Sequence, residues 1–99
     1  MPRNALKVGI AGLGAVGLNV ARRLEEGIPG LVLAAVAVRD RDKARRNLAG
    51  AGERIPIVAA DALAEACDIV IECLPPPLFR GVSLSVIGHG KIFMPLSVG

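Results

Sequence analysis

The sequence predicts an α/β fold in which helices cover both faces of one parallel β-sheet, the doubly wound arrangement. Apolar segments of strand length alternate with segments of helical periodicity along the whole chain. Residues 31–38 (LVLAAVAV) are apolar at every position, which is typical of a strand buried on both faces. Hydrophobic residues make up 53% of the chain but include only two aromatic residues, so aliphatic side chains must build the core.

Five strands and four intervening helices are expected from the pattern. The strands are expected at residues 7–11, 31–38, 55–58, 68–74 and 91–96, and the helices at residues 15–26, 42–49, 61–66 and 78–87. Right-handed crossovers then give the strand order 3-2-1-4-5. Pro56 donates no hydrogen bond, which favours an edge position for the third strand. Asp61 is expected to cap the third helix, whereas Gly81 weakens the helical pattern of the fourth.

Length and composition indicate a single domain, residues 1–99, in the cytoplasm. The longest apolar run has eight residues, far fewer than the ~20 of a membrane helix, and no signal peptide is visible. Cys67 and Cys73 fit neither a metal motif nor a disulfide framework, so we expect no metal. The short apolar runs also make a membrane an unexpected partner. The basic residues between positions 39 and 46 have no aromatic neighbours for base stacking, so nucleic acid is not an expected partner either.

The segment GLGAVG follows the pattern G-x-G-x-x-G between a buried strand and an amphipathic helix, the context of a Rossmann-type dinucleotide-binding turn. Gly12 permits the tight turn, Gly14 lets a pyrophosphate approach the backbone, and Gly17 lets the helix pack close to the strand. The free N–H groups around Ala15 and Val16 are expected to bind the phosphates. The alternative is a turn that binds nothing, but three glycines at a helix start then destabilise the helix without a compensating interaction.

The end of the second strand bears on the choice between NAD and NADP. NAD-selective domains usually carry an acidic residue there for the ribose 2′-hydroxyl. In this chain Val38 occupies that point, and Arg39 follows it with a guanidinium suited to a 2′-phosphate or to adenine. A register shifted by two residues makes Asp40 the ribose acceptor, and a third interpretation makes Asp40 only the cap of a solvated helix. We favour Arg39, with NADP or NAD as the cofactor.

The ends of the fourth and fifth strands are expected to meet the nicotinamide half of the cofactor. Cys73, Leu74 and Pro75, with Pro76 after them, predict a stiff apolar wall near the nicotinamide ribose. Ser97 is expected to hydrogen-bond the carboxamide or the ribose.

No residue of the chain is expected to be catalytic. Cys73 resembles an inert strand cysteine, and Glu72 is interpreted as an exposed acid at a strand end. His89, the only histidine, is interpreted as a loop residue without an acidic partner.

Four segments resemble the N-terminal domain of the L-aspartate dehydrogenase family, which is related to the homoserine dehydrogenase NAD-binding domain. They are VGIAGLGAVG, RLEEGIPGLVLAAVAVRDRDKAR, DIVIECLPP and GKIFMPLSVG. The resemblance implies NAD(P) binding and, in the complete enzyme, oxidation of L-aspartate to iminoaspartate for NAD biosynthesis. It also implies pyrophosphate binding by the glycine turn, adenosine contacts by Arg39 or Asp40, and nicotinamide contacts by residues 73–76 and Ser97.

The resemblance further implies a second domain with the substrate pocket, the acid/base histidine and much of a dimer interface. We interpret the 99 residues as a domain that lacks this catalytic part, truncated relative to full-length dehydrogenases, which binds cofactor without turnover. The alternative function is a non-catalytic dinucleotide-binding or regulatory module. Because residues 91–96 would form an uncovered apolar edge, we also expect self-association or docking of the missing domain.

Overall fold

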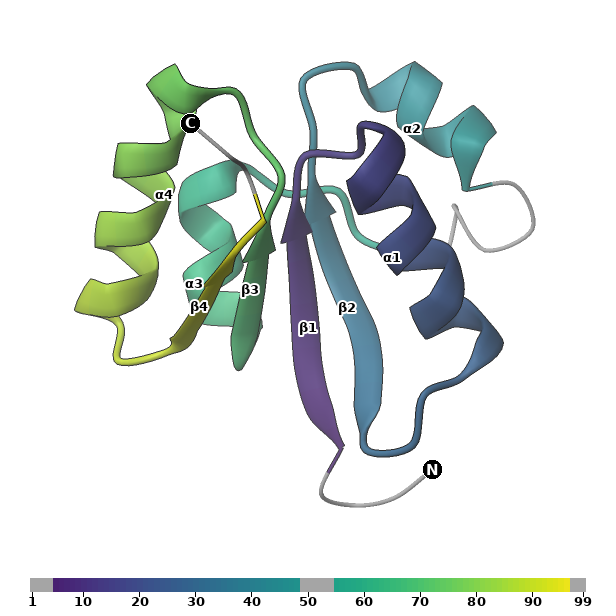
Figure 1. Cartoon of the computed structure of the whole chain (residues 1–99), viewed down its shortest axis with the longest axis horizontal. Helices are drawn as coiled ribbons and strands as arrows, with labels where there is room; N and C mark the ends of the chain where they lie inside the picture. Colours follow the sequence, from purple (N-terminus) through teal and green to yellow (C-terminus); the bar gives the residue numbers. More distant parts are fainter. Residues whose placement is uncertain (1–4, 49–54, 97–99) are drawn as a thin grey trace.

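The computed structural model of the chain describes residues 5–48 and 55–96. Its elements in chain order are β1 (Leu6–Ala11), α1 (Ala15–Glu26), β2 (Leu31–Ala37), α2 (Arg41–Asn47), the short 3₁₀ helix η1 (Ala60–Ala62), α3 (Leu63–Ala66), β3 (Ile69–Glu72), α4 (Pro76–Gly88) and β4 (Ile92–Pro95) (Figure 1). The alternation of strands and helices predicted from the sequence is confirmed.

The sheet has four parallel strands in the order β2-β1-β3-β4. The expected count of five strands is wrong, because residues 55–58 form only an isolated parallel bridge between Val36 and Ile57. This bridge lies beside β2, where the third strand was expected. Val36 N donates to Pro56 O and Val58 N donates to Val36 O, but Pro56 has no N–H group with which to extend the ladder.

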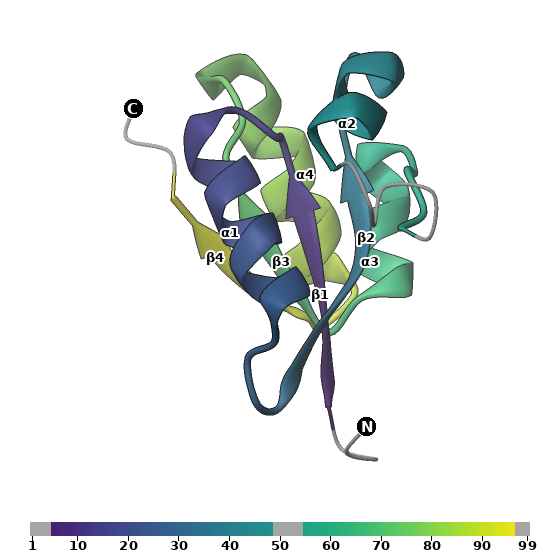
Figure 2. The same cartoon turned by 90° about the vertical axis from the view of Figure 1, so that its right-hand side faces the viewer.

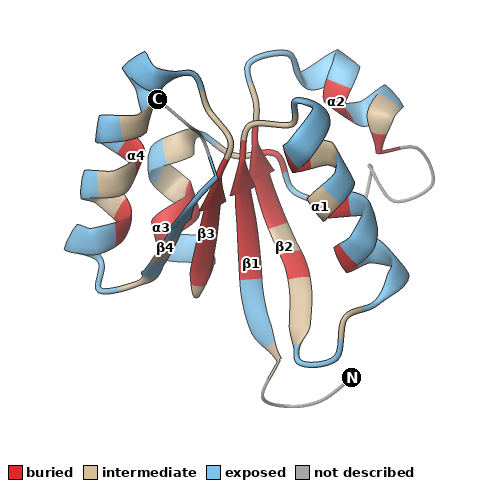
Figure 3. Cartoon of the chain, viewed as in Figure 1, coloured by how far each residue is buried: buried red, intermediate tan, exposed pale blue. Residues whose placement is uncertain are grey.

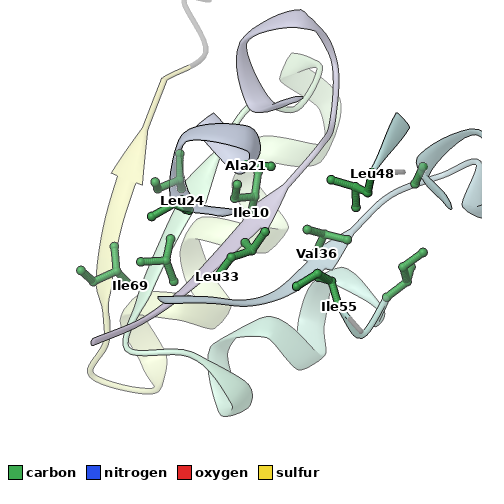
Figure 4. Packing of buried hydrophobic residues seen from close by; sticks show 12 residues of the cluster. Ile10, Ala21, Leu24, Leu33, Val36, Leu48, Ile55 and Ile69 are labelled. Carbon is green, nitrogen blue, oxygen red and sulfur yellow. The ribbon is translucent and has the colours of Figure 1, made fainter. Parts of the chain in front are cut away.

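Helices cover the sheet on both faces (Figures 1 and 2). On one face, buried residues of α1 and α2 pack against alternate strand residues such as Ile10, Leu33 and Ile69 (Figure 4). On the other face, buried residues of α3 and α4 pack against Val70 and neighbouring strand residues. The aliphatic core expected from the composition is therefore divided into two layers by the sheet.

The starts of the last two helices differ from the sequence prediction by two residues. α4 begins at Pro76 rather than at residue 78, because a proline in the first helical turn lacks only an N–H that has no partner there. Pro76 thus belongs to the helix and not to the loop after β3. Asp61 does not cap a helix: it lies inside η1, and neither η1 nor α3 has a side-chain cap.

The two outer strands differ in burial (Figure 3). β2 is buried at four of its positions, whereas none of the residues of β4 is buried. Phe93 of β4 packs edge-on against Phe79 of α4, with the ring centroids 5.5 Å apart. Ile92 and Met94 remain 55% and 44% exposed. Within the described residues, no helix is long and apolar enough to cross a membrane.

Candidate functional site

A cavity of about 920 Å³ opens at the carboxyl ends of the strands. The chain reverses its direction of travel across the sheet between β1 and β3, and such a switch point is where doubly wound folds bind ligands. The cavity is lined by residues 12–17, 37–40, 43–44, 47, 60–61, 73–75, 78, 81–82 and 96. Every layer of the fold therefore contributes to one site.

Gly12 and Gly17 are required by the protein's own packing. Gly12 has a φ of 95°, and a Cβ added to it would lie 2.6 Å from the carbonyl oxygen of Cys73. A Cβ on Gly17 would overlap the carbonyl oxygen of Gly12. These two glycines bring α1, the end of β1 and the loop after β3 together, as the sequence pattern predicted for the turn and the helix packing.

Gly14 is different, because nothing in the protein requires it to be a glycine. Its φ is −71°, and an added Cβ would meet no atom within 4 Å. Gly14 is the N-cap of α1 and provides no side-chain hydrogen bond, so the first N–H groups of the helix remain without side-chain partners. Ala15 and Val16 of this first turn line the cavity, and Val16 is 56% exposed.

At the end of β2, the structure brings Val38, Arg39, Asp40 and Lys43 to the cavity. Asp40 caps α2, since its Oδ1 accepts a hydrogen bond from Lys43 N at 3.0 Å. The interpretation of Asp40 as a helix cap is confirmed. The side chain of Arg39 is exposed at the cavity wall. The contacts of Arg39 or Asp40 with a cofactor stay predictions.

Glu72 corrects the interpretation of an exposed acid at a strand end, because it is completely buried. It pairs with Ala11 of β1 and with Pro95 of β4, so neighbours flank it on both sides. Its Oε2 accepts a hydrogen bond from Leu74 N at 2.8 Å, and Cys73 N donates to Ala11 O at 2.8 Å. The position of Glu72 inside an apolar run was the sequence signal for this burial. The carboxylate fixes the loop that forms one cavity wall.

Both thiols are free, and burial raises their pKa values. The nearby charge of Glu72 raises the pKa of Cys73 further, so this thiol stays protonated at neutral pH. Cys67 is buried against Gly9, whose added Cβ would lie 2.6 Å from its Sγ. Neither cysteine is therefore suited to be a nucleophile.

His89 follows α4 and is not among the cavity residues. Its Nδ1 lies 2.7 Å from Ser85 O, and its Nε2 lies 4.0 Å from a carboxylate oxygen of Glu65. The expectation that it has no acidic neighbour is wrong, although the contact is long and exposed. In the described part of the chain, no cluster of histidine, cysteine and acidic residues is suited to hold a metal.

The predicted cofactor residues that the structure describes all line the cavity: Gly12, Gly14, Ala15, Val16, Gly17, Arg39, Asp40, Cys73, Leu74 and Pro75. Ser97 lies outside the described residues. The sequence interpretation did not include Lys43, Asn47, Asp61, Leu78 or Gly81. Helical spacing is the only signal for four of them, because it places residues 43 and 47 on one face of α2 and residues 78 and 81 on one face of α4. Asp61 lies in η1 and has no such signal.

Two L-aspartate dehydrogenases are similar in sequence to this chain. L-Aspartate dehydrogenase from Bradyrhizobium diazoefficiens is 42% identical over 94 residues, covering 95% of this chain and 33% of that protein. An L-aspartate dehydrogenase from Bordetella bronchiseptica is 36% identical over 98 residues, covering 98% of this chain and 36% of that protein. The chain thus spans about a third of the length of these curated relatives.

A solved structure indicates the fold of the chain, and a family model indicates its family. The structure of scyllo-inositol dehydrogenase from Lactobacillus casei, with bound NAD(H) and scyllo-inositol, matches with a TM-score of 0.78 at 20% identity, over 92% of this chain and 27% of that one. This likeness shows a Rossmann-type fold. The model of the homoserine dehydrogenase NAD-binding domain matches residues 12–99. The chain belongs to this family and is an NAD-binding domain that resembles L-aspartate dehydrogenase.

Proposed function

We propose that this chain is the cofactor domain of a dehydrogenase that oxidises L-aspartate to iminoaspartate, a reaction that feeds NAD biosynthesis. The 99 residues bind NAD or NADP, and the groups that bind and deprotonate the amino acid come from other parts of the enzyme. The similarity to two L-aspartate dehydrogenases supports the substrate. The free thiols of Cys67 and Cys73 are compatible with the reducing cytoplasm, where we place the protein.

Gly14 is the observation that carries the proposal. A Cβ there meets no protein atom, so packing does not require a glycine, and unlike Gly88 this position lines the cavity. The open space lies at the start of α1, where unpaired N–H groups and the helix dipole attract anions. A pyrophosphate bound there leaves one half of the dinucleotide toward Arg39 and the other toward residues 73–75 and Ser97.

The preference for NADP or NAD rests on the end of β2. The cap of α2 occupies one oxygen of Asp40, while Arg39 is exposed and lines the cavity. We therefore assign the 2′-phosphate of NADP to Arg39. Lys43, one helical turn into α2, adds a second positive charge on the same wall.

Binding of the reduced cofactors, followed by fluorescence and calorimetry, tests the proposal. The 99-residue chain should bind NADH or NADPH and show no turnover with L-aspartate. Gly14→Ala should keep the fold, measured by circular dichroism, but weaken both cofactors at least about tenfold, since its methyl group occupies the phosphate space. Gly88→Ala is the matched control, because its Cβ also meets no atom and lies outside the cavity. Absence of binding at millimolar concentration would refute the proposal.

We further propose that the exposed face of β4 makes a contact between copies of this chain. Ile92 and Met94 of β4 are each at least 44% exposed and form an apolar edge. Light scattering should show dimers or larger species, and Met94→Lys should shift them toward the monomer. A monomer at high concentration of the unmodified chain would contradict this contact.

A further inference from the structure

Among the described residues, Glu72 is the only charged residue that is completely buried. It is the last residue of β3, and Ala11 and Pro95 are its neighbours in the strands on either side. Burying a carboxylate costs free energy, and the amide oxygen of a glutamine can also accept the hydrogen bond from Leu74 N. Holding the loop therefore does not by itself explain why this side chain carries a charge.

The carboxylate of Glu72 lies behind the wall of the cavity that follows β3. Its Oε2 is 2.8 Å from Leu74 N, and both Cys73 and Leu74 line the cavity, whereas Glu72 does not. Burial raises the pKa of the Cys73 thiol, and the negative charge of Glu72 raises this pKa further. The electric field of the carboxylate therefore reaches the surface of the cavity.

The wall in front of the carboxylate is apolar. The loop after β3 and the end of β4 contribute Cys73, Leu74, Pro75 and Leu96 to the cavity. The charged cavity residues come from other parts of the chain, namely the end of β2, α2 and η1. An apolar wall screens a charge far less than water does, so a ligand against this wall experiences the field of Glu72.

The two oxidation states of a nicotinamide cofactor differ in charge, because the oxidised ring is positive and the reduced ring is neutral. We propose that the buried carboxylate of Glu72 makes the cavity prefer the oxidised cofactor, by attracting the positive ring across the wall formed by residues 73–75. Glu72 does not line the cavity, so it acts through its charge and not through contact. This inference rests on the proposed binding of NAD or NADP. Such a preference suits an enzyme that takes up the oxidised cofactor to oxidise its substrate.

Three ligands separate an effect of charge from a change in the shape of the site. NAD⁺, NADH and ADP-ribose share the adenosine and the pyrophosphate, but only NAD⁺ carries the positive ring. In calorimetry the unmodified chain should bind NAD⁺ at least about threefold more tightly than NADH. Glu72→Gln keeps an acceptor for Leu74 N and removes the charge. It should weaken NAD⁺ at least about tenfold and leave NADH and ADP-ribose within about twofold.

Glu65→Gln is the matched control, because it removes an equal charge from an exposed position outside the cavity and should change no affinity. Equal losses of NAD⁺ and NADH in Glu72→Gln, or unchanged binding of NAD⁺, overturn the role of the charge. If circular dichroism shows that Glu72→Gln does not fold, Glu72→Met replaces it. NADH bound as tightly as NAD⁺ by the unmodified chain overturns the inference without any variant. If the unmodified chain binds none of the three ligands, the proposed function fails with it.

Discussion

The glycine turn and the end of β2 belong to the same cavity, but they are built in different ways. In the turn, Gly12 and Gly17 act through the atoms they lack, and backbone groups form the surface. At the end of β2, the surface consists of the side chains of Arg39, Asp40 and Lys43. A backbone surface suits a phosphate, which every dinucleotide carries, whereas side chains distinguish one cofactor from another. The loop after β3 differs from both, because the buried carboxylate of Glu72 holds it without lining the cavity.

The largest expected effect follows from the first kind of construction. Gly17→Ala places a Cβ on the carbonyl oxygen of Gly12, so α1 must move away from β1. We expect the free energy of unfolding to fall by more than about 3 kcal/mol, or the chain not to fold. Urea unfolding measures this loss. A stability within about 1 kcal/mol of the unmodified chain would mean that the turn has more room than the structure gives it.

The loop after β3 should respond to the chemistry of one side chain. Glu72→Leu removes the acceptor of the Leu74 N–H, and we expect a loss of about 1–3 kcal/mol in the free energy of unfolding. Glu72→Gln retains an acceptor oxygen and should recover most of this stability. If leucine and glutamine behave alike in urea unfolding, the hydrogen bond does not fix the loop.

The end of β2 should respond in cofactor preference more than in stability. Arg39→Ala is expected to weaken NADPH by about 1–3 kcal/mol more than NADH, because a charge-assisted bond to the 2′-phosphate is lost. Arg41→Ala removes an equal charge from α2 outside the cavity and serves as the control. Equal losses of both cofactors, measured by calorimetry, would refute the 2′-phosphate role of Arg39.

The smallest effect is expected at the cap of α2. Asp40→Ala should lower the free energy of unfolding by about 1 kcal/mol, and Asp40→Asn should largely preserve it, because asparagine also caps helices. Neither change should alter NADH binding if the cap is the only role of Asp40. A selective loss of NADH affinity in Asp40→Ala would show that the carboxylate also holds the ribose.

The contrast between a backbone surface and side-chain surfaces also explains which features could be predicted from the sequence. The turn follows from residue types alone, because glycine spacing between a strand and a helix has few alternatives. The apolar run around Glu72 signals its burial, but its pairing with Ala11 and Pro95 depends on strands distant in sequence, which no local pattern contains. Residues 55–58 have the composition of a strand, but Pro56 limits them to one bridge. Gly81 and Asp61 line the same cavity because α4 and η1 meet, with Ser85 Oγ donating to Asp61 O, and only the structure shows this.

The central position of β1 has a consequence for how the protein folds during its synthesis. β1 pairs on one edge with β2, which follows it soon in the chain, and on the other edge with β3, which comes about thirty residues after β2. During synthesis, the β1–α1–β2 unit can form early, while the wall made by residues 73–75 is added much later. The cofactor therefore finds its complete site only after most of the chain has emerged. Its binding then stabilises the whole domain, by about 2.7 kcal/mol at one hundred times the dissociation constant.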